Sequence, residues 1–167
     1  MNQPKDRARP RRRGILPIVA LAAIALGGLA FVYGKAAMDA NKGTRADAGD
    51  AKLVAEGRAV YAQHCAECHG AKLEGQPNWR TRNPDGTFPA PPHDPSGHTW
   101  HHPDRVLFAI TKDGGQRHAP QGFKSGMPPF AGTLSDRQIA AALAYIKSTW
   151  PDEIRRRQDT IDKAATK

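Results

Sequence analysis

The sequence predicts an all-α chain in which an N-terminal transmembrane helix precedes one small helical domain. Residues 15–33 form an uncharged, mostly aliphatic run directly after a basic N-terminus. Three later segments, 51–64, 103–112 and 136–149, repeat apolar residues at helical spacing, and no segment has a convincing strand pattern. The 16 glycines and 14 prolines predict short helices joined by substantial loops.

The net charge of +9 suggests a nucleic-acid partner until its distribution is considered. Residues 1–14 carry a net charge of +5, which leaves +4 for the rest of the chain. A basic segment before an apolar run directs membrane topology, and it keeps residues 1–14 in the cytoplasm. We therefore expect no nucleic-acid partner.

The apolar run 15–33 has the length of a membrane span, roughly 28 Å at about 1.5 Å per residue. It is longer than the usual apolar region of a cleaved signal peptide. The nearest candidate cleavage site is Gly34-Lys35-Ala36, in which the lysine is unfavourable. The sequence therefore predicts an uncleaved, single-pass signal anchor, with a cleaved signal peptide as the alternative.

Residues 34–49 are small and polar, which predicts a flexible tether, and residues 50–150 are expected to form the domain. The helix over 51–64 begins the domain. Its expected buried face comprises Leu53, Gly57, Val60, Tyr61 and His64.

Two further helices are expected in the domain, followed by a charged C-terminal tail. Pro103 suits the first position of the second helix, and Gly114 and Gly115 end it. Ser135 and Gln138 match a capping box at the start of the helix over 136–149. Pro151 interrupts that helix, and residues 151–167 are expected to be a charged tail with at most a short solvated helix.

Cys65-Ala-Glu-Cys68-His69 has the spacing of a c-type haem attachment motif. Two thiols at this spacing bond to the two vinyl groups of one haem, and the adjacent imidazole coordinates the iron. A thioredoxin-like redox pair should open a helix in a strand-rich fold, whereas this motif follows a helix. A zinc site needs further ligands at a different spacing. The sequence thus predicts one covalently bound haem c, and its iron, at Cys65, Cys68 and His69.

Met127 is the single methionine after this motif and lies in the loop Gly126-Met127-Pro128-Pro129-Phe130. A thioether is a soft ligand that suits haem iron, and the two prolines stiffen its loop. A core gap-filling role is the alternative, although a loop between glycine and proline is a poor place for it. We therefore expect Met127 to be the second axial ligand.

Together the haem motif, the methionine loop and the Leu134-Ser135-Asp136 helix start resemble a class I monohaem cytochrome c over about residues 52–150. The resemblance implies an all-α fold around haem in which the first and last helices cross. It assigns helix contacts to Gly57, Tyr61 and Tyr145. It also implies that a proline carbonyl orients the proximal histidine, and the candidates are Pro91 and Pro92.

The segment 71–102 departs from the family pattern and is rich in His, Arg and Trp. Its four histidines, His93, His98, His101 and His102, could bind copper or supply another axial ligand, although a polar loop at the haem edge is favoured. Trp79, Arg80 and Arg82 could hold the haem propionates or lie in a solvated loop. His64 and His118 are expected at the surface.

The function predicted from these features is one-electron transfer between membrane and periplasmic redox partners. Haem is attached outside the bacterial cytoplasmic membrane, which is where the anchor would deliver the domain. With two axial ligands, the iron has no open coordination position, so an enzyme is not expected. A haem peroxidase, a sensor and a copper-handling protein remain the alternatives.

Overall fold

The computed structural model describes residues 45–165 of the chain. The expected basic tail (1–14), membrane anchor (15–33) and first part of the tether (34–44) lie outside the described residues. Within residues 45–165, no helix has both the length and the apolar character needed to cross a membrane.

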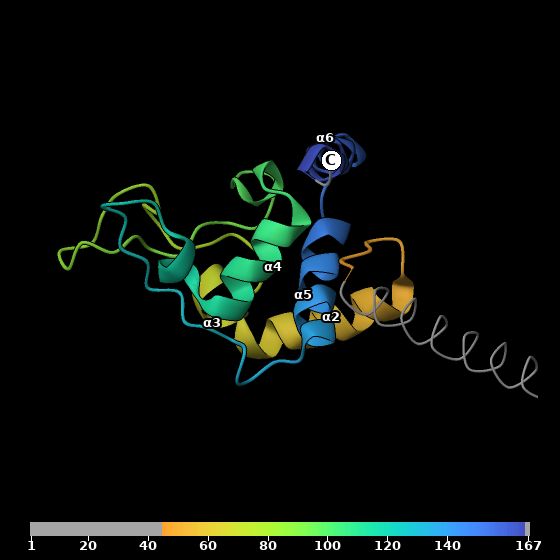
Figure 1. Cartoon of the computed structure of the whole chain (residues 1–167), viewed down its shortest axis with the longest axis horizontal. Coiled ribbons are helices and arrows are strands. Elements are labelled where there is room, and N and C mark those ends of the chain that lie inside the picture. The colour runs from red at the N-terminus through yellow and green to blue at the C-terminus, as the bar shows by residue number, and fades with distance from the viewer. Residues whose placement is uncertain (1–44, 166–167) are drawn as a thin grey trace, which may run out of the picture. The chain divides into compact units, whose positions relative to one another are not determined.

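The described part of the chain is helical (Figure 1). It contains α2 (Ala51–His64), α3 (Ala66–His69), α4 (Asp104–Asp113), α5 (Asp136–Ser148), α6 (Asp152–Ala165) and the short 3-10 helices η1 (Thr99–His101) and η2 (Gly115–His118). Extended pairing within residues 45–165 is limited to one isolated bridge between Thr87 and Lys124. The expectation of an all-α domain is thereby confirmed for this part of the chain.

The first helix of the domain, α2, has the predicted bounds and the predicted buried face. The Asp50 carboxylate accepts hydrogen bonds from the backbone N–H groups of Lys52 and Leu53, at 3.0 and 3.1 Å, and so caps the helix. Four of the five expected positions are buried, and His64 is half-buried at the end of the helix.

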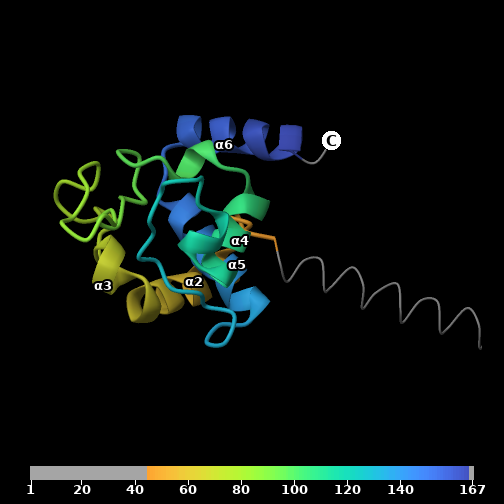
Figure 2. The same cartoon turned by 60° about the vertical axis from the view of Figure 1, so that its left-hand side comes forward.

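Helix α5 crosses α2 and forms the centre of the core (Figure 2). Ser135 and Gln138 form the predicted capping box. At the crossing, a Cβ atom on Gly57 would overlap the backbone carbonyl of Ala141. The rings of Tyr61 and Tyr145 meet beside it with centroids 5.4 Å apart. The helix contacts expected from the family resemblance are therefore present.

The C-terminal segment is more ordered and more closely packed than expected. Residues 152–165 form the 14-residue helix α6, which packs against η1 and buries Gln158 completely. The expectation of a short solvated helix was wrong because a mostly charged sequence does not reveal a polar docking face.

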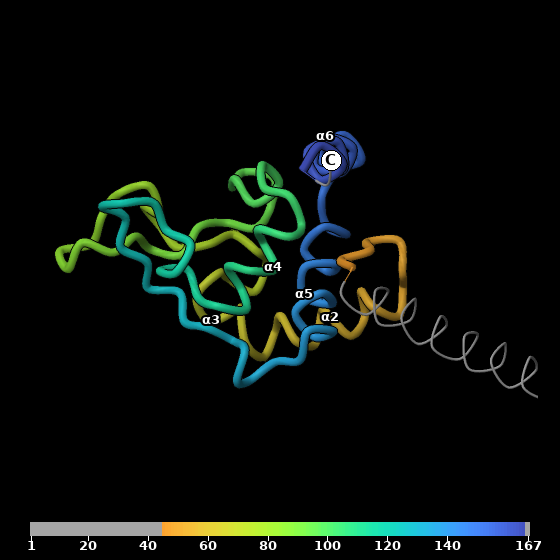
Figure 3. The backbone as a smooth tube through the Cα atoms, viewed as in Figure 1, coloured from red at the N-terminus to blue at the C-terminus, as the bar shows by residue number. Residues whose placement is uncertain are grey.

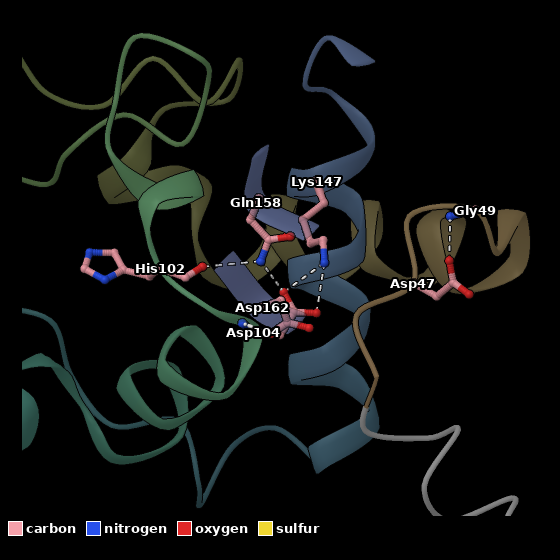
Figure 4. A network of polar contacts seen from close by, with 7 residues as sticks. All are labelled: Asp47, Gly49, His102, Asp104, Lys147, Gln158 and Asp162. Atoms are coloured by element: carbon pink, nitrogen blue, oxygen red, sulfur yellow. Dashed lines mark hydrogen bonds and ion pairs between the residues drawn. The ribbon is translucent and has the colours of Figure 1, made fainter. Parts of the chain in front are cut away.

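One carboxylate joins three helices at this docking face (Figure 4). Asp104, at the start of α4, pairs with the buried Lys147 of α5 at 2.8 Å. It also accepts a hydrogen bond from Gln158 Nε2 at 2.7 Å, and Gln158 Nε2 donates to the His102 carbonyl at 3.3 Å. The Asp104 N–H donates to the Asp162 carboxylate at 2.8 Å. This network fixes the start of α4 and the chain leading into it.

Candidate haem-binding site

The attachment motif is wound into a single helical turn. The N–H groups of Cys68 and His69 both donate to the Cys65 carbonyl, at 3.2 and 2.9 Å. Residues at positions i, i+3 and i+4 of a helix share one side, so the two thiols and the imidazole lie on the same side of this turn. Both thiols are free. This is the arrangement that two thioether bonds and one axial ligand to a single haem require.

The two thiols differ in their surroundings. Cys65 is half-buried at the junction of α2 and α3, whereas Cys68 is exposed. Burial, together with the nearby Cys68 thiol, raises the pKa of Cys65 to about 11. Cys65 is therefore a neutral thiol at neutral pH, and it packs against the hydrophobic core.

The imidazole of His69 is oriented by the backbone of the segment 71–102. Its Nδ1 lies 2.8 Å from the Pro91 carbonyl oxygen. Because a carbonyl can only accept, Nδ1 carries the proton, and the neutral ring has its lone pair on Nε2. Of the two candidate prolines, Pro91 is thus the one that orients the ring. Burial lowers the pKa of His69, and the hydrogen bond to Pro91 only partly offsets this, so the ring is held neutral, as coordination requires.

Close backbone packing holds Pro91 in reach of the histidine. A Cβ atom on Gly75 would lie 2.7 Å from the Pro91 carbonyl carbon, and Gly75 has a φ of +70°. Its N–H donates to the His69 carbonyl at 2.8 Å. Glycine is therefore needed at this position both for backbone conformation and for space.

The four histidines of this segment do not form one group. His93 stacks on the His69 ring, with centroids 4.0 Å apart and planes 23° apart, and its Nδ1 lies 2.8 Å from Thr99 Oγ1. Burial, followed by the neighbouring histidines, lowers its pKa well below the ordinary value. His93 is thus an interior packing partner of His69 rather than part of a polar surface loop.

The remaining three histidines make ring contacts outside the attachment turn. His98 stacks on Trp79 with centroids 5.7 Å apart, and His102 meets His98 edge-on at 5.5 Å. His101 packs against Trp100 at 3.7 Å. Among the described residues, no group of three or more His, Cys, Asp or Glu side chains is arranged to hold a metal ion. The structure thus provides no geometric support for the copper alternative.

Met127 lies half-buried in a loop that backbone hydrogen bonds anchor. Its carbonyl accepts the Gly115 N–H at 3.1 Å, and its N–H donates to Ser125 Oγ at 3.2 Å. Three residues later, the Phe130 N–H donates to the Lys112 carbonyl at 3.1 Å. The end of α4 and the start of η2 therefore fix the backbone that carries the thioether.

The residues present fit a covalently bound haem. Besides the two thiols and the Nε2 lone pair of His69, the indole Nε1 of Trp100 is buried and has no hydrogen-bond partner within residues 45–165. A buried donor without a partner is uncommon in a folded protein and fits an acceptor supplied by a bound group. Sequence reasoning singled out Trp79 for this role and did not consider Trp100.

A comparison with protein families also indicates a haem-binding domain, over most of the predicted domain. The family model described as "Cytochrome c" matches residues 54–150, which is more than half of the chain. No curated protein and no solved structure matched the chain significantly. The chain therefore belongs to the cytochrome c family, whose members bind haem c covalently through its vinyl groups and generally carry electrons.

Proposed function

We propose that the protein is a membrane-anchored, one-electron carrier whose haem is tethered by Cys65 and Cys68 and ligated by His69 and Met127. The observation that carries this proposal is the 2.8 Å contact between His69 Nδ1 and the Pro91 carbonyl, on the same helical turn as both thiols. It leaves Nε2 free to coordinate beside the two attachment points. The bound haem supplies one iron that alternates between the ferrous and ferric states.

Residues of the chain would hold the iron and set its reduction potential. The Pro91 carbonyl increases the basicity of the His69 ring and fixes its direction. The Met127 thioether would be the second protein ligand of the iron and would favour the ferrous state, which raises the reduction potential. With both His69 and Met127 holding the iron, the protein would exchange electrons with redox partners and would not bind a small substrate at the iron.

Replacement of the methionine tests the ligand assignment. We expect the ferric protein to be low-spin, with a methionine-to-iron charge-transfer band. Met127→Ala should lose this band and shift towards high spin, whereas Met127→His should stay low-spin at a markedly lower potential. Met38→Ala is the matched control and should change neither property. Retention of the band in Met127→Ala would refute ligation by Met127.

The proposed location is the bacterial cytoplasmic membrane, with residues 1–14 in the cytoplasm and the haem domain in the periplasm. The support is the basic segment before the apolar run 15–33. We expect the full chain to sediment with membranes and to resist extraction by high salt. A form in which a cleavable signal peptide replaces residues 1–34 should be released as soluble periplasmic protein. If expression of the full sequence instead gives a soluble protein whose N-terminus has been shortened, the apolar run is a cleaved signal peptide.

A further inference from the structure

Two loops that are far apart in the sequence lie against each other beside the methionine. We name residues 78–90 the outer loop and residues 119–130 the methionine loop. Figure 3 shows their traces running side by side at one end of the domain. Thr87 and Lys124 form a parallel backbone bridge, and Lys124 Nζ donates to the Asp85 carbonyl at 2.8 Å. The outer loop belongs to the segment that departs most from the family pattern.

Arg82 is at the centre of this contact. One guanidinium nitrogen donates to the Gly86 carbonyl at 2.9 Å, within the outer loop. The other donates to the Gly122 carbonyl at 3.2 Å, across to the methionine loop. The same guanidinium lies 4.6 Å from the centre of the Phe88 ring, which stacks on Phe123 at 5.0 Å. One planar side chain thus holds both loops at once, as the fork of donors in arginine allows.

The methionine loop is also tied to η2. Gln116 Nε2 donates to the Phe123 carbonyl at 3.2 Å, and Gln116 Oε1 accepts the Ser125 N–H at 2.9 Å. The stretch immediately before Met127 therefore contacts both Gln116 and the outer loop. If the loop swings outward, the contacts of Arg82, Phe88 and Lys124 must break.

We propose that the outer loop is a clamp that keeps Met127 in place, with Arg82 as its main positioning residue. This inference rests on the ligand role proposed for Met127. Its consequence concerns ligand exchange at the iron. An external ligand could replace the Met127 sulfur on the iron only in molecules whose methionine loop has opened. The ligand's apparent affinity should therefore follow the fraction of molecules in which the loop is open.

Imidazole titration of the ferric holoprotein tests the clamp. We expect Arg82→Ala to bind imidazole about tenfold more tightly than the unmodified protein, because loss of the clamp raises the open fraction by that factor. Phe123→Ala should act in the same direction. Arg82→Lys keeps the charge but cannot make both guanidinium hydrogen bonds. Its affinity for imidazole should therefore lie between those of the unmodified protein and Arg82→Ala.

Arg117→Ala is the matched control. It also removes one arginine near the methionine loop, but the Arg117 side chain is 75% exposed and faces Asp113 at 4.0 Å. Its imidazole affinity should equal that of the unmodified protein. If Arg82→Ala and Phe123→Ala also bind imidazole as the unmodified protein does, the clamp is refuted. Far-ultraviolet circular dichroism and the ferrous spectrum show whether each variant is folded.

The spectrum before titration separates this test from that of the proposed function. If the unmodified protein lacks the methionine-to-iron band, the ligand assignment itself has failed. If the band is present and lost on imidazole binding, but neither clamp variant changes the affinity, then Met127 is a ligand and the outer loop does not hold it.

Discussion

His69 is held through its ring and through its backbone. The ring is fixed by the Pro91 carbonyl and by the stacked His93 ring, while the buried Tyr61 hydroxyl lies 3.3 Å from the His69 carbonyl and 3.0 Å from the Gly70 carbonyl. These contacts join the end of α3 to α2. The orientation of the His69 ring therefore depends on residues outside the attachment motif.

Removal of the Tyr61 hydroxyl should loosen this attachment. Tyr61→Phe removes the hydroxyl that donates to these two carbonyls, which keep the backbone N–H donors of Gly75 and Leu73. We therefore expect the free energy of unfolding to fall by about 1 kcal/mol, the net contribution of one hydrogen bond. Denaturant unfolding of the holoprotein measures it. Tyr145→Phe is the control, because within residues 45–165 the Tyr145 hydroxyl makes no hydrogen bond. Equal stability of the two variants would contradict the assigned role.

The cap of α2 should make stability depend on pH in the acid range. The hydrogen bond from the Leu53 N–H lowers the pKa of Asp50 below its ordinary value of 3.8. Because the folded-state pKa is the lower one, the ionised carboxylate stabilises the fold above pH 3.8, and this contribution is lost as the pH falls further.

Asp50→Asn keeps a capping oxygen but removes the charge that titrates. We expect the native chain to have the higher Tm near neutral pH, and the difference should shrink as the pH falls from about 5 to about 3. Thermal melts at constant ionic strength measure it. A difference that does not vary with pH would show that the charge contributes nothing.

At the scale of elements, the crossing of α2 and α5 depends on the absence of a side chain. Gly57→Ala would place a methyl group on the Ala141 carbonyl and force the helices apart. We expect a loss of about 1–3 kcal/mol of stability, measured by denaturant unfolding. Gly132→Ala is the control, since no atom lies within 4 Å of the added Cβ there. A neutral Gly57→Ala would show that the crossing tolerates a wider spacing.

Local sequence predicted the helices that bury long apolar faces. It failed for α6, which packs Ile154 against the hydrophobic core but docks mainly through polar side chains. Helices α2 and α5 have both periodic apolar residues and strong N-caps, and both kinds of signal lie within a few residues. Helix α6 docks through Gln158 and charged side chains. A helix exposed to solvent contains the same residue types, so they do not indicate packing. The packing of α6 depends on the Asp104 carboxylate some 50 residues earlier, and no local pattern indicates that contact.

At the scale of the whole molecule, α6 acts as a brace for the start of α4. A chain that ends at Trp150 loses two hydrogen bonds to Asp104 and the Arg157 contact with the Trp100 ring, at 6.0 Å. We expect it to lose about 2 kcal/mol or more of stability while keeping its haem and its methionine-to-iron band. Thermal unfolding and the ferric spectrum check both parts.

Single substitutions separate this brace from a general effect of truncation. Gln158→Ala should reproduce part of the loss, because it removes one of the two side chains that bind the Asp104 carboxylate and leaves Lys147. Asp159→Ala, at an exposed neighbouring position, should not. Truncation without any change in Tm would mean that α6 adds nothing to the domain.

The sequence alone predicted those parts of the site whose residues are close together in the chain. The thiols and His69 lie within one turn, so their spacing alone indicates haem. Selection of Pro91 over Pro92, the stacking of His93 on His69 and the contact between Arg82 and Gly122 all depend on how loops 20 to 40 residues apart meet. No spacing rule covers such contacts, and the structure was needed to find them.

Haem attachment to the motif is the central claim, and acid–acetone extraction followed by peptide mass spectrometry tests it most directly. We predict that the haem stays with the polypeptide and that one haem adds its mass to the tryptic peptide 59–72, which contains both cysteines. Cys65→Ser combined with Cys68→Ser should release the haem into acetone. Free extraction of haem from the unmodified protein, with both thiols still reactive, would contradict the account.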